Sequence, residues 1–122
     1  SRYLCPLMDT STGYYIADAA HPLICTGPLW EELLLCHIPS ERHAELCECF
    51  ERISGKAIRP GSILSELSGG QKVILMLCLA VISPAESICF IDLDHSLDPA
   101  KLTAAMELIG SSGKSNRWQT AP

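Results

Sequence analysis

The residues with the clearest chemical potential form the run Leu67-Ser68-Gly69-Gly70-Gln71. A serine followed three residues later by a glutamine predicts a capping box, in which each side chain hydrogen-bonds the backbone amide of the other residue at the start of a helix. The two glycines between them allow a phosphate or another backbone to approach N–H groups whose dipole favours an anion. The run therefore indicates either a phosphate-binding helix start or a plain helix cap.

A second group of reactive side chains follows an apolar stretch, in the segment Ile91-Asp92-Leu93-Asp94-His95-Ser96-Leu97-Asp98. Carboxylates that follow a buried strand can orient Mg²⁺ or polarise an attacking water. Asp98 precedes Pro99 and is expected to cap a helix. Asp94 and His95 are expected to be polar turn residues, although a histidine there could also lie beside a phosphate.

The order of these parts resembles the C-terminal lobe of an ABC-type ATPase head, in a superfamily that includes transporter ATPases, structural-maintenance-of-chromosomes (SMC) proteins and double-strand-break repair ATPases. The resemblance covers residues 62–110. It makes LSGGQ the signature motif, the strand ending in aspartate the Walker B motif, and the Ser-Leu-Asp turn the D-loop. It implies that the ATP of an opposite subunit is bound by Ser68, Gly69, Gly70, Gln71 and Asp98, with Lys72 adding positive charge nearby.

The acidic segment departs from the family pattern in two possible registers. If Asp92 is the Walker B aspartate, Leu93 occupies the position of the catalytic glutamate. If the spacing is counted back from Asp98, Ile91 replaces the metal-orienting aspartate and Asp92 replaces the glutamate. Asp92 is thus the candidate catalytic residue of a degenerate Walker B motif, and both registers predict damaged hydrolysis.

The phosphate loop of the family, Walker A, is missing ahead of the signature, because no G-x-x-x-x-G-K-[ST] pattern occurs there. The GKS that ends at Ser115 has Leu108 where the first glycine is required and follows a predicted helix instead of a strand. We therefore expect ATP and Mg²⁺ as cofactors only in complex with a partner that carries Walker A. The chain alone is not expected to be an active ATPase.

The elements that must position these residues are predicted from hydrophobic spacing and from glycine and proline. Residues 13–17 and 22–25 favour two strands in a hairpin. Two helices should follow, one from 26–28 to Pro39 and one from an N-cap at Ser40 to Gly55.

The signature should then open a helix that runs to about Ile82 and is buried on most sides. That uninterrupted apolarity makes the resemblance lean toward the SMC and repair branch, because the same helix of the transporters usually carries arginines. A buried strand over 87–91 should lead to a last helix, whose inward side chains are predicted to be Leu102, Ala105, Met106 and Ile109.

These elements predict an α/β fold, a partial P-loop NTPase (ABC ATPase-like) lobe with helices packed on a small sheet. We expect one compact domain with three parts. They are an N-terminal strand and helical part at 1–60, the lobe with the signature, Walker B-like motif and D-loop at 61–110, and a flexible polar tail at 111–122.

Composition limits the partners and the compartment. The formal charge is −5 and the nine Lys and Arg residues are scattered, which disfavours direct nucleic-acid binding. The longest apolar run, 73–82, is too short to span a membrane. Seven cysteines in largely apolar contexts indicate free thiols in a reducing cytoplasm. A metal site is disfavoured because no CxxC pair has zinc-finger spacing.

The favoured function is an ABC/SMC-like module that presents its signature motif to ATP held by a partner subunit, either a second copy in a homodimer or an ABC/SMC-type ATPase. One alternative is a degenerate ABC-like fold that acts as a protein-interaction or assembly domain without nucleotide. Another is a fragment of a complete ABC-type ATPase.

Overall fold

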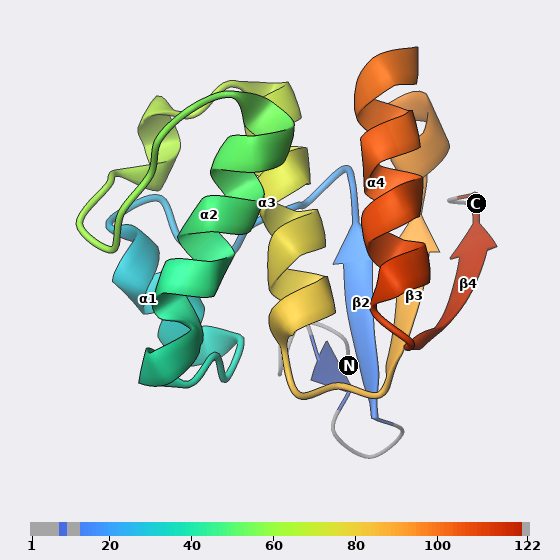
Figure 1. The fold of residues 1–122 in the computed structure, drawn as a ribbon, viewed down its shortest axis with the longest axis horizontal. Helices are drawn as coiled ribbons and strands as arrows, with labels where there is room; N and C mark the ends of the chain where they lie inside the picture. The colour runs from blue at the N-terminus through green and yellow to red at the C-terminus, as the bar shows by residue number, and fades with distance from the viewer. Residues whose placement is uncertain (1–7, 10–12, 121–122) are drawn as a thin grey trace.

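The computed structural model describes residues 8–9 and 13–120, which form an α/β fold (Figure 1). Its strands lie in one sheet in the order of the chain. β1 is antiparallel to β2, whereas β3 is parallel to both of its neighbours, β2 and β4. The strands are β1 (Met8–Asp9), β2 (Tyr14–Asp18), β3 (Ser87–Ile91) and β4 (Ser115–Gln119).

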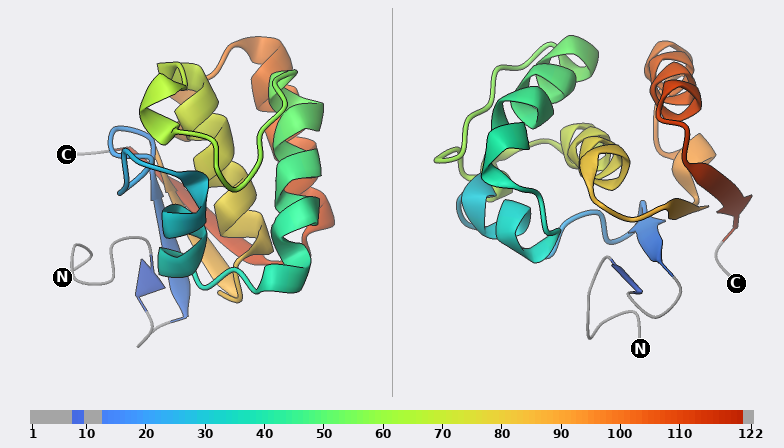
Figure 2. Two further views of the ribbon diagram at one scale, coloured as in Figure 1. Left: turned by 90° about the vertical axis from the view of Figure 1, so that its left-hand side faces the viewer. Right: turned by 60° about the horizontal axis from the view of Figure 1, so that its bottom comes forward.

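The α-helices of the described chain lie on one side of this sheet (Figure 2). This follows from the strand order, because right-handed crossovers between successive parallel strands bring their helices to the same face. The helices are α1 (Leu29–Leu35), α2 (His43–Ser54), α3 (Gly69–Ile82) and α4 (Pro99–Ser111). Short 3₁₀ turns occur at Ser40–Arg42, Leu64–Glu66 and Leu93–His95.

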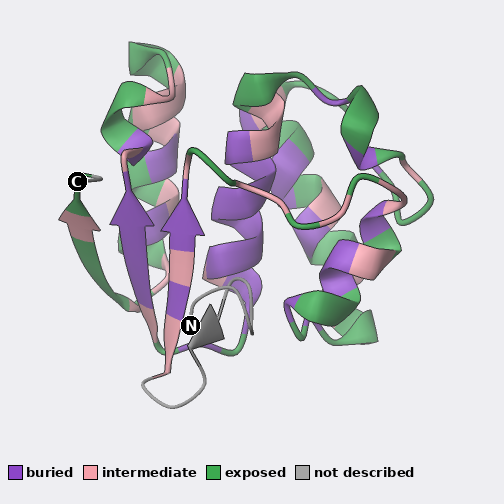
Figure 3. Ribbon diagram, turned by 180° about the vertical axis from the view of Figure 1, so that it is seen from behind, coloured by how far each residue is buried: buried purple, intermediate pink, exposed green. Residues whose placement is uncertain are grey.

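Helix α3 lies at the centre of the core, in contact with β2, α2 and α4. All of its residues from 73 to 80 are buried, as is Ile82, which confirms the prediction of a helix buried on most sides. Tyr15 and Ala17 of β2 and Phe90 of β3 belong to the same hydrophobic cluster, so alternate strand residues pack against the helices (Figure 3). The long helix is thereby fixed against the sheet, and its first turn is held in place.

Several local predictions are confirmed. Helix α2 buries the expected face and ends at Gly55, whose φ of 78° is the left-handed conformation that favours glycine. Ser68 and Asp98 are the N-caps of α3 and α4, and Pro99 occupies the first helical position. Ser40, however, is not the cap of α2, because it starts a 3₁₀ turn and the helix begins at His43.

The predicted strand at 22–25 is wrong. The amides of Ile24 and Cys25 donate to the carboxylate of Glu32, a fully buried side chain of α1, with Cys25 N at 2.8 Å from Oε1. These amides are satisfied by a side chain and make no sheet ladder. The strand that pairs with β2 in an antiparallel direction is β1, through Met8 opposite Tyr15.

The predicted flexible tail at 111–122 is also wrong over 115–119, which form β4. The strand pairs with β3, and the Trp118 ring packs on Phe90 with 5.0 Å between ring centroids. Its other residues are exposed, so the edge strand lacks the apolar alternation that sequence reasoning requires. Residues 121–122 lie outside the described part of the chain.

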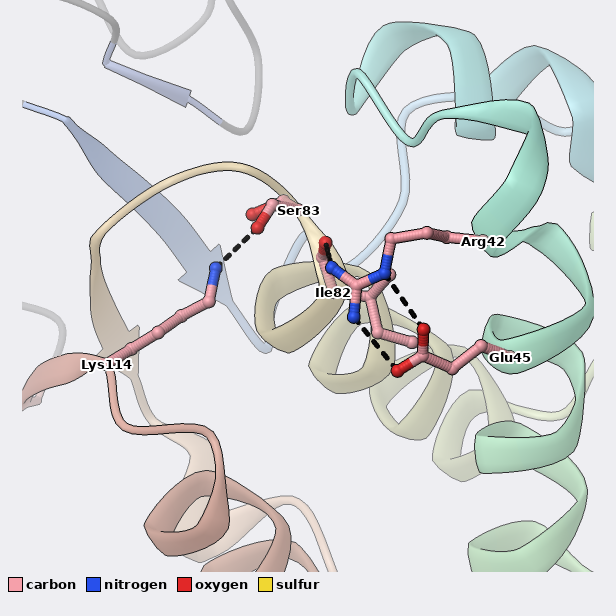
Figure 4. Close-up of polar contacts among 5 residues, drawn as sticks. All are labelled: Arg42, Glu45, Ile82, Ser83 and Lys114. Atoms are coloured by element: carbon pink, nitrogen blue, oxygen red, sulfur yellow. Dashed lines mark hydrogen bonds and ion pairs between the residues drawn. The ribbon is translucent and has the colours of Figure 1, made fainter.

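The C-terminal end of α3 is closed by two cations from other parts of the chain (Figure 4). Arg42 donates from Nη1 to the carbonyl of Ile82 at 2.9 Å and pairs with Glu45, while the Lys114 ammonium donates to the carbonyls of Ser83 and Ala85. Cations at this position satisfy orphan carbonyls and oppose the negative end of the helix dipole. Lys114 therefore connects the start of β4 to the central helix.

Met106 was predicted to face inward but is 50% exposed. The inward positions of Ala105 and Ile109 are confirmed, since both are buried, and Leu102 is partly buried. Helix α4 packs on α2 and α3 along a narrow stripe, which leaves Met106 outside. No helix within the described ranges is long and apolar enough to cross a membrane.

Candidate functional site

The first turns of α3 and α4 open into one cleft of about 380 Å³. Four of the residues predicted to bind a nucleotide line it, namely Ser68, Gly70, Gln71 and Asp98. The remaining lining residues are Ser54, Ile74, Ser96, Leu97 and Lys101. The fold thus brings the signature segment and the Ser-Leu-Asp turn together, although they are separated by a whole helix and strand.

The start of α3 is a complete capping box. The amide of Gln71 donates to Ser68 Oγ at 3.1 Å, and the amide of Ser68 donates to Gln71 Oε1 at 2.9 Å. A helix leaves four amides at its start without intrahelical acceptors, and the box satisfies the first and fourth of these. In the described structure the amides of Gly69 and Gly70 are therefore the two that keep no protein acceptor.

The two glycines leave room in front of these amides. A Cβ atom built on Gly69 or Gly70 would meet nothing within 4 Å outside its own helix, and neither residue has a positive φ. The backbone conformation consequently does not require glycine at either position. What the glycines provide is an open approach to the start of α3.

The start of α4 differs, because its cap is charged. Asp98 Oδ1 accepts from the amide of Lys101 at 2.9 Å, and Pro99 has no N–H to offer. Of the first three helical positions only Ala100 keeps an amide without an acceptor in the described chain. The Asp98 carboxylate also opposes the positive end of the α4 dipole, so this wall attracts an anion less than the α3 wall does.

Lys101 supplies the positive side chain of the cleft. Its ammonium donates to the carbonyl of Ile53, in the last turn of α2, at 3.0 Å. Neither Lys101 nor Ser54, the last residue of α2, was predicted from the sequence to belong to the site. The sequence signal for Lys101 was weak, since a lysine in the first turn of a helix is disfavoured by the dipole and can indicate a specific contact.

Asp92 lies outside the cleft lining. It directly follows β3 with a φ of 59°, and its amide donates to the carbonyl of Gln119 at 3.0 Å. Its own carbonyl accepts from Ser96 Oγ at 2.8 Å. Leu93, which stands at the glutamate position in one register, is fully buried. The structure therefore does not group Asp92 with the residues at the start of α3.

Asp94 and His95 are surface residues of the turn after Asp92. Their side chains are more than half exposed and lie 3.6 Å apart, between His95 Nε2 and Asp94 Oδ2. This is the geometry of a weak, solvated ion pair. Across the residues that the structure describes, no three His, Cys, Asp or Glu side chains gather to hold a metal ion.

Comparison with known proteins gives no relative from which a role could be transferred: no protein-family model matches the chain, and no curated protein matches it. The functional argument therefore depends on the geometry of the cleft. That geometry combines two open glycine amides, a neutral cap and an ammonium group at the junction of three helix ends.

Proposed function

We propose that this chain presents the start of α3 to the terminal phosphate of an ATP molecule held by a partner polypeptide. The observation that carries this proposal is the pair of amides at Gly69 and Gly70, which the capping box leaves without a protein acceptor. Gly70 lines the cleft, whereas Gly69, the residue before it, does not. In this function the chain is an ABC/SMC-like module, and its α/β fold is a partial P-loop NTPase lobe.

The chemistry of the α3 start suits a phosphate oxygen. Hydrogen bonds from amides to a charged oxygen contribute about 1.5–3 kcal/mol each, and the helix dipole adds to them. The cap at Ser68 is neutral, so no carboxylate of this first turn repels the anion. Lys101 contributes positive charge from the opposite wall.

The partner must hold the rest of the nucleotide. The chain has no Walker A sequence ahead of the signature, and the lysine of its late GKS is already bound to two backbone carbonyls at the end of α3. We therefore assign the phosphate loop, Mg²⁺ and most of the ATP contacts in this proposal to a partner polypeptide that carries Walker A.

Hydrolysis is assigned to the partner as well. Asp92 does not line the cleft, and Leu93 offers no carboxylate. A general base has to reach the attacking water, and the cleft residues of this chain include no carboxylate other than the helix cap Asp98. The expected role of the chain is to complete the phosphate site and not to cleave ATP by itself.

The test is a titration of the ¹⁵N-labelled chain with inorganic phosphate, followed by amide NMR. The resonances of Gly69 and Gly70 should shift in a saturable way, whereas those of Gly110 and Gly113, which neither line the cleft nor adjoin a lining residue, should not. Equal responses at all four glycines, or none, would contradict the proposal. The measurement needs neither the partner nor ATP.

A second candidate function, protein binding without nucleotide, is favoured by the exposed apolar side chains near α1. Trp30 is 48% exposed, Leu34 is 66% exposed and Ile63 is 38% exposed. Exposed apolar groups of this size are typical of interaction surfaces when they gather. Sedimentation of the chain and of Leu34→Glu tests the homodimer form of this function, which requires association that the variant weakens. A wild-type chain that stays monomeric would contradict it.

A further inference from the structure

We propose that β4 is a displaceable strand over a binding site on β3, and that an extended segment of another polypeptide takes its place there. The site has two parts. The carbonyls of Ser83 and Ala85 bind an ammonium group, which in this structure is that of Lys114. The Phe90 ring binds an aromatic ring, here that of Trp118, with 5.0 Å between the centroids. None of these residues lines the phosphate cleft, so β4 can be displaced whether or not a phosphate is bound there.

β4 has few of the contacts that hold a strand to the core. Four of its five residues are exposed, and the fifth, Trp118, is partly buried. β3 is the one described element with which the strand has extensive contacts. The indole N–H of Trp118 donates to Asn116 Oδ1 at 3.0 Å, within the strand itself, so this bond does not attach β4 to the core. Segments with few buried apolar contacts open at the lowest free energies.

A short connection allows the strand to move as a unit. Helix α4 ends at Ser111 and β4 begins at Ser115, at the edge of the sheet (Figure 1). Between them lies Gly113, whose φ of 73° is the left-handed conformation that favours glycine. A Cβ atom built on Gly113 would meet nothing within 4 Å. Rotation about this glycine moves β4 away from β3 and leaves α4 in place.

The Lys114 ammonium is the main anchor of the strand (Figure 4). Hydrogen bonds from a charged donor contribute about 1.5–3 kcal/mol each, more than a neutral bond does. Burial, followed by the Arg42 charge, lowers the pKa of Lys114, so its surroundings disfavour the cation and weaken the anchor. Arg42 still binds the carbonyl of Ile82 when Lys114 has left, so the end of α3 keeps one cation. Opening is therefore confined to β4.

The opened site defines the chemistry of the segment that binds there. Release of β4 exposes the backbone groups along one edge of β3, residues 87–91, to which an extended segment adds as a parallel strand. The carbonyls that follow α3 lie at the negative end of its dipole and require a cation. Phe90 requires an aromatic ring four residues further along, as Trp118 is from Lys114 in β4. The partner therefore carries a lysine followed four residues later by an aromatic residue.

The first test is amide hydrogen exchange of the wild-type chain, which needs no variant. The amide of Asp92 donates to the carbonyl of Gln119, and the amide of Ser115 donates to that of Glu86, so both report the attachment of β4. They should exchange at least about tenfold faster than the amides in the middle of α3, through an opening that urea hardly affects. Exchange of both groups at the same free energy and with the same urea dependence would overturn the proposal.

The second test is binding of a labelled synthetic peptide with the sequence of residues 113–120, measured by fluorescence anisotropy. Only the open fraction of the chain binds the peptide, so Lys114→Met should bind it at least about tenfold more tightly than the wild type. Peptides with alanine in place of Lys114 or Trp118 should bind severalfold more weakly, and a scrambled peptide should not bind.

Arg42→Gln is the matched control for the chain. It removes the other cation at the same end of α3 but leaves the anchor of β4 intact, so it should bind the peptide as the wild type does. Two results would overturn the proposal: Lys114→Met that binds the peptide no better than Arg42→Gln, or equal binding of the β4 peptide and the scrambled one.

Discussion

At its C-terminal end α3 receives two cations from other parts of the chain, whereas at its N-terminal end it keeps two glycine amides without a protein acceptor in the described structure. Arg42 and Lys114 bind the carbonyls of Ile82, Ser83 and Ala85. At the opposite end the capping box uses only uncharged groups. The negative end of the helix is therefore neutralised internally, and the positive end is not.

The difference means that the C-terminal end of α3 contributes to folding, whereas the N-terminal end is available for binding. Charges at helix ends contribute about 0.3–1 kcal/mol at exposed sites and up to about 2 kcal/mol where they are partly buried. The chain uses that free energy for folding at one end, where Lys114 is half-buried. At the other end the same free energy stays available for an external anion. Changes at the two ends should accordingly affect different measurements.

Removal of a cation at the C-terminal end of α3, here called the closed end, should have the largest effect on stability. Lys114→Met leaves the carbonyls of Ser83 and Ala85, two buried residues, without their donor. The free energy of unfolding should therefore fall by about 2 kcal/mol. Urea denaturation measures this loss. Lys56→Met, at an exposed position, is the control and should stay within about 0.5 kcal/mol of wild type. Phosphate shifts at Gly69 should be the same in both variants.

A negative charge at the N-terminal end of α3, here called the open end, should neutralise the helix dipole there as the two cations do at the C-terminal end. Ser68→Asp keeps a good helix cap but places a carboxylate beside the glycine amides, so phosphate binding should weaken about tenfold, which is about 1.4 kcal/mol. Ser68→Thr preserves a neutral cap and should bind phosphate as the wild type does. If both variants bind phosphate equally, the neutral cap is not what keeps the site open.

A methyl group at the open end should have a smaller effect, which raises stability and weakens phosphate binding. Gly70→Ala meets nothing within 4 Å and improves helix propensity, so the chain should gain up to about 1 kcal/mol of stability. Because Gly70 lines the cleft, its phosphate response should still weaken by a few fold. Gly69→Ala should give the same gain with a smaller loss of binding. Thermal unfolding and the NMR titration separate the two effects.

Acid should have the smallest effect, and only at the closed end. The hydrogen bond from Arg42 lowers the pKa of Glu45, so its stabilising contribution is complete above the unfolded pKa of about 4.3 and is lost as the pH falls through the lower folded value. The pair is largely exposed, which limits this contribution to about 0.3 kcal/mol. In Glu45→Gln, the free energy of unfolding should fall by about 0.3 kcal/mol less than in the wild type when the pH is lowered through this range. The same pH dependence in both proteins would contradict the assignment.

The open end was largely predictable from the sequence, and the closed end was not. The local patterns here are the capping box, the pair Asp98-Pro99 and the glycine after α2. In each of them a few neighbouring residues determine the backbone geometry. The signature helix was equally clear, because its apolar residues are contiguous. The α/β class followed from the order of such elements.

The closed end depends on pairs of residues that are distant in sequence. Lys114 binds carbonyls at Ser83 and Ala85, and nothing in its own neighbourhood indicates that contact. β4 is polar because it is an edge strand, and a polar segment after a helix is typical of a tail. Likewise Lys101 joined the cleft only through its long-range bond to Ile53. Local patterns cannot encode such contacts, which arise when the core assembles.

The pairing of β2 with β3 has a consequence for how fast the chain folds. Tyr14 lies opposite Ser87, so α1, α2 and α3 are all inserted between two strands that must meet. Closing so long a loop is entropically costly, and folding slows as contacts become less local. Until β2 arrives, the apolar edge of β3 at Ile88 and Phe90 is open to other chains. Refolding should therefore be slow and should lose yield as protein concentration rises.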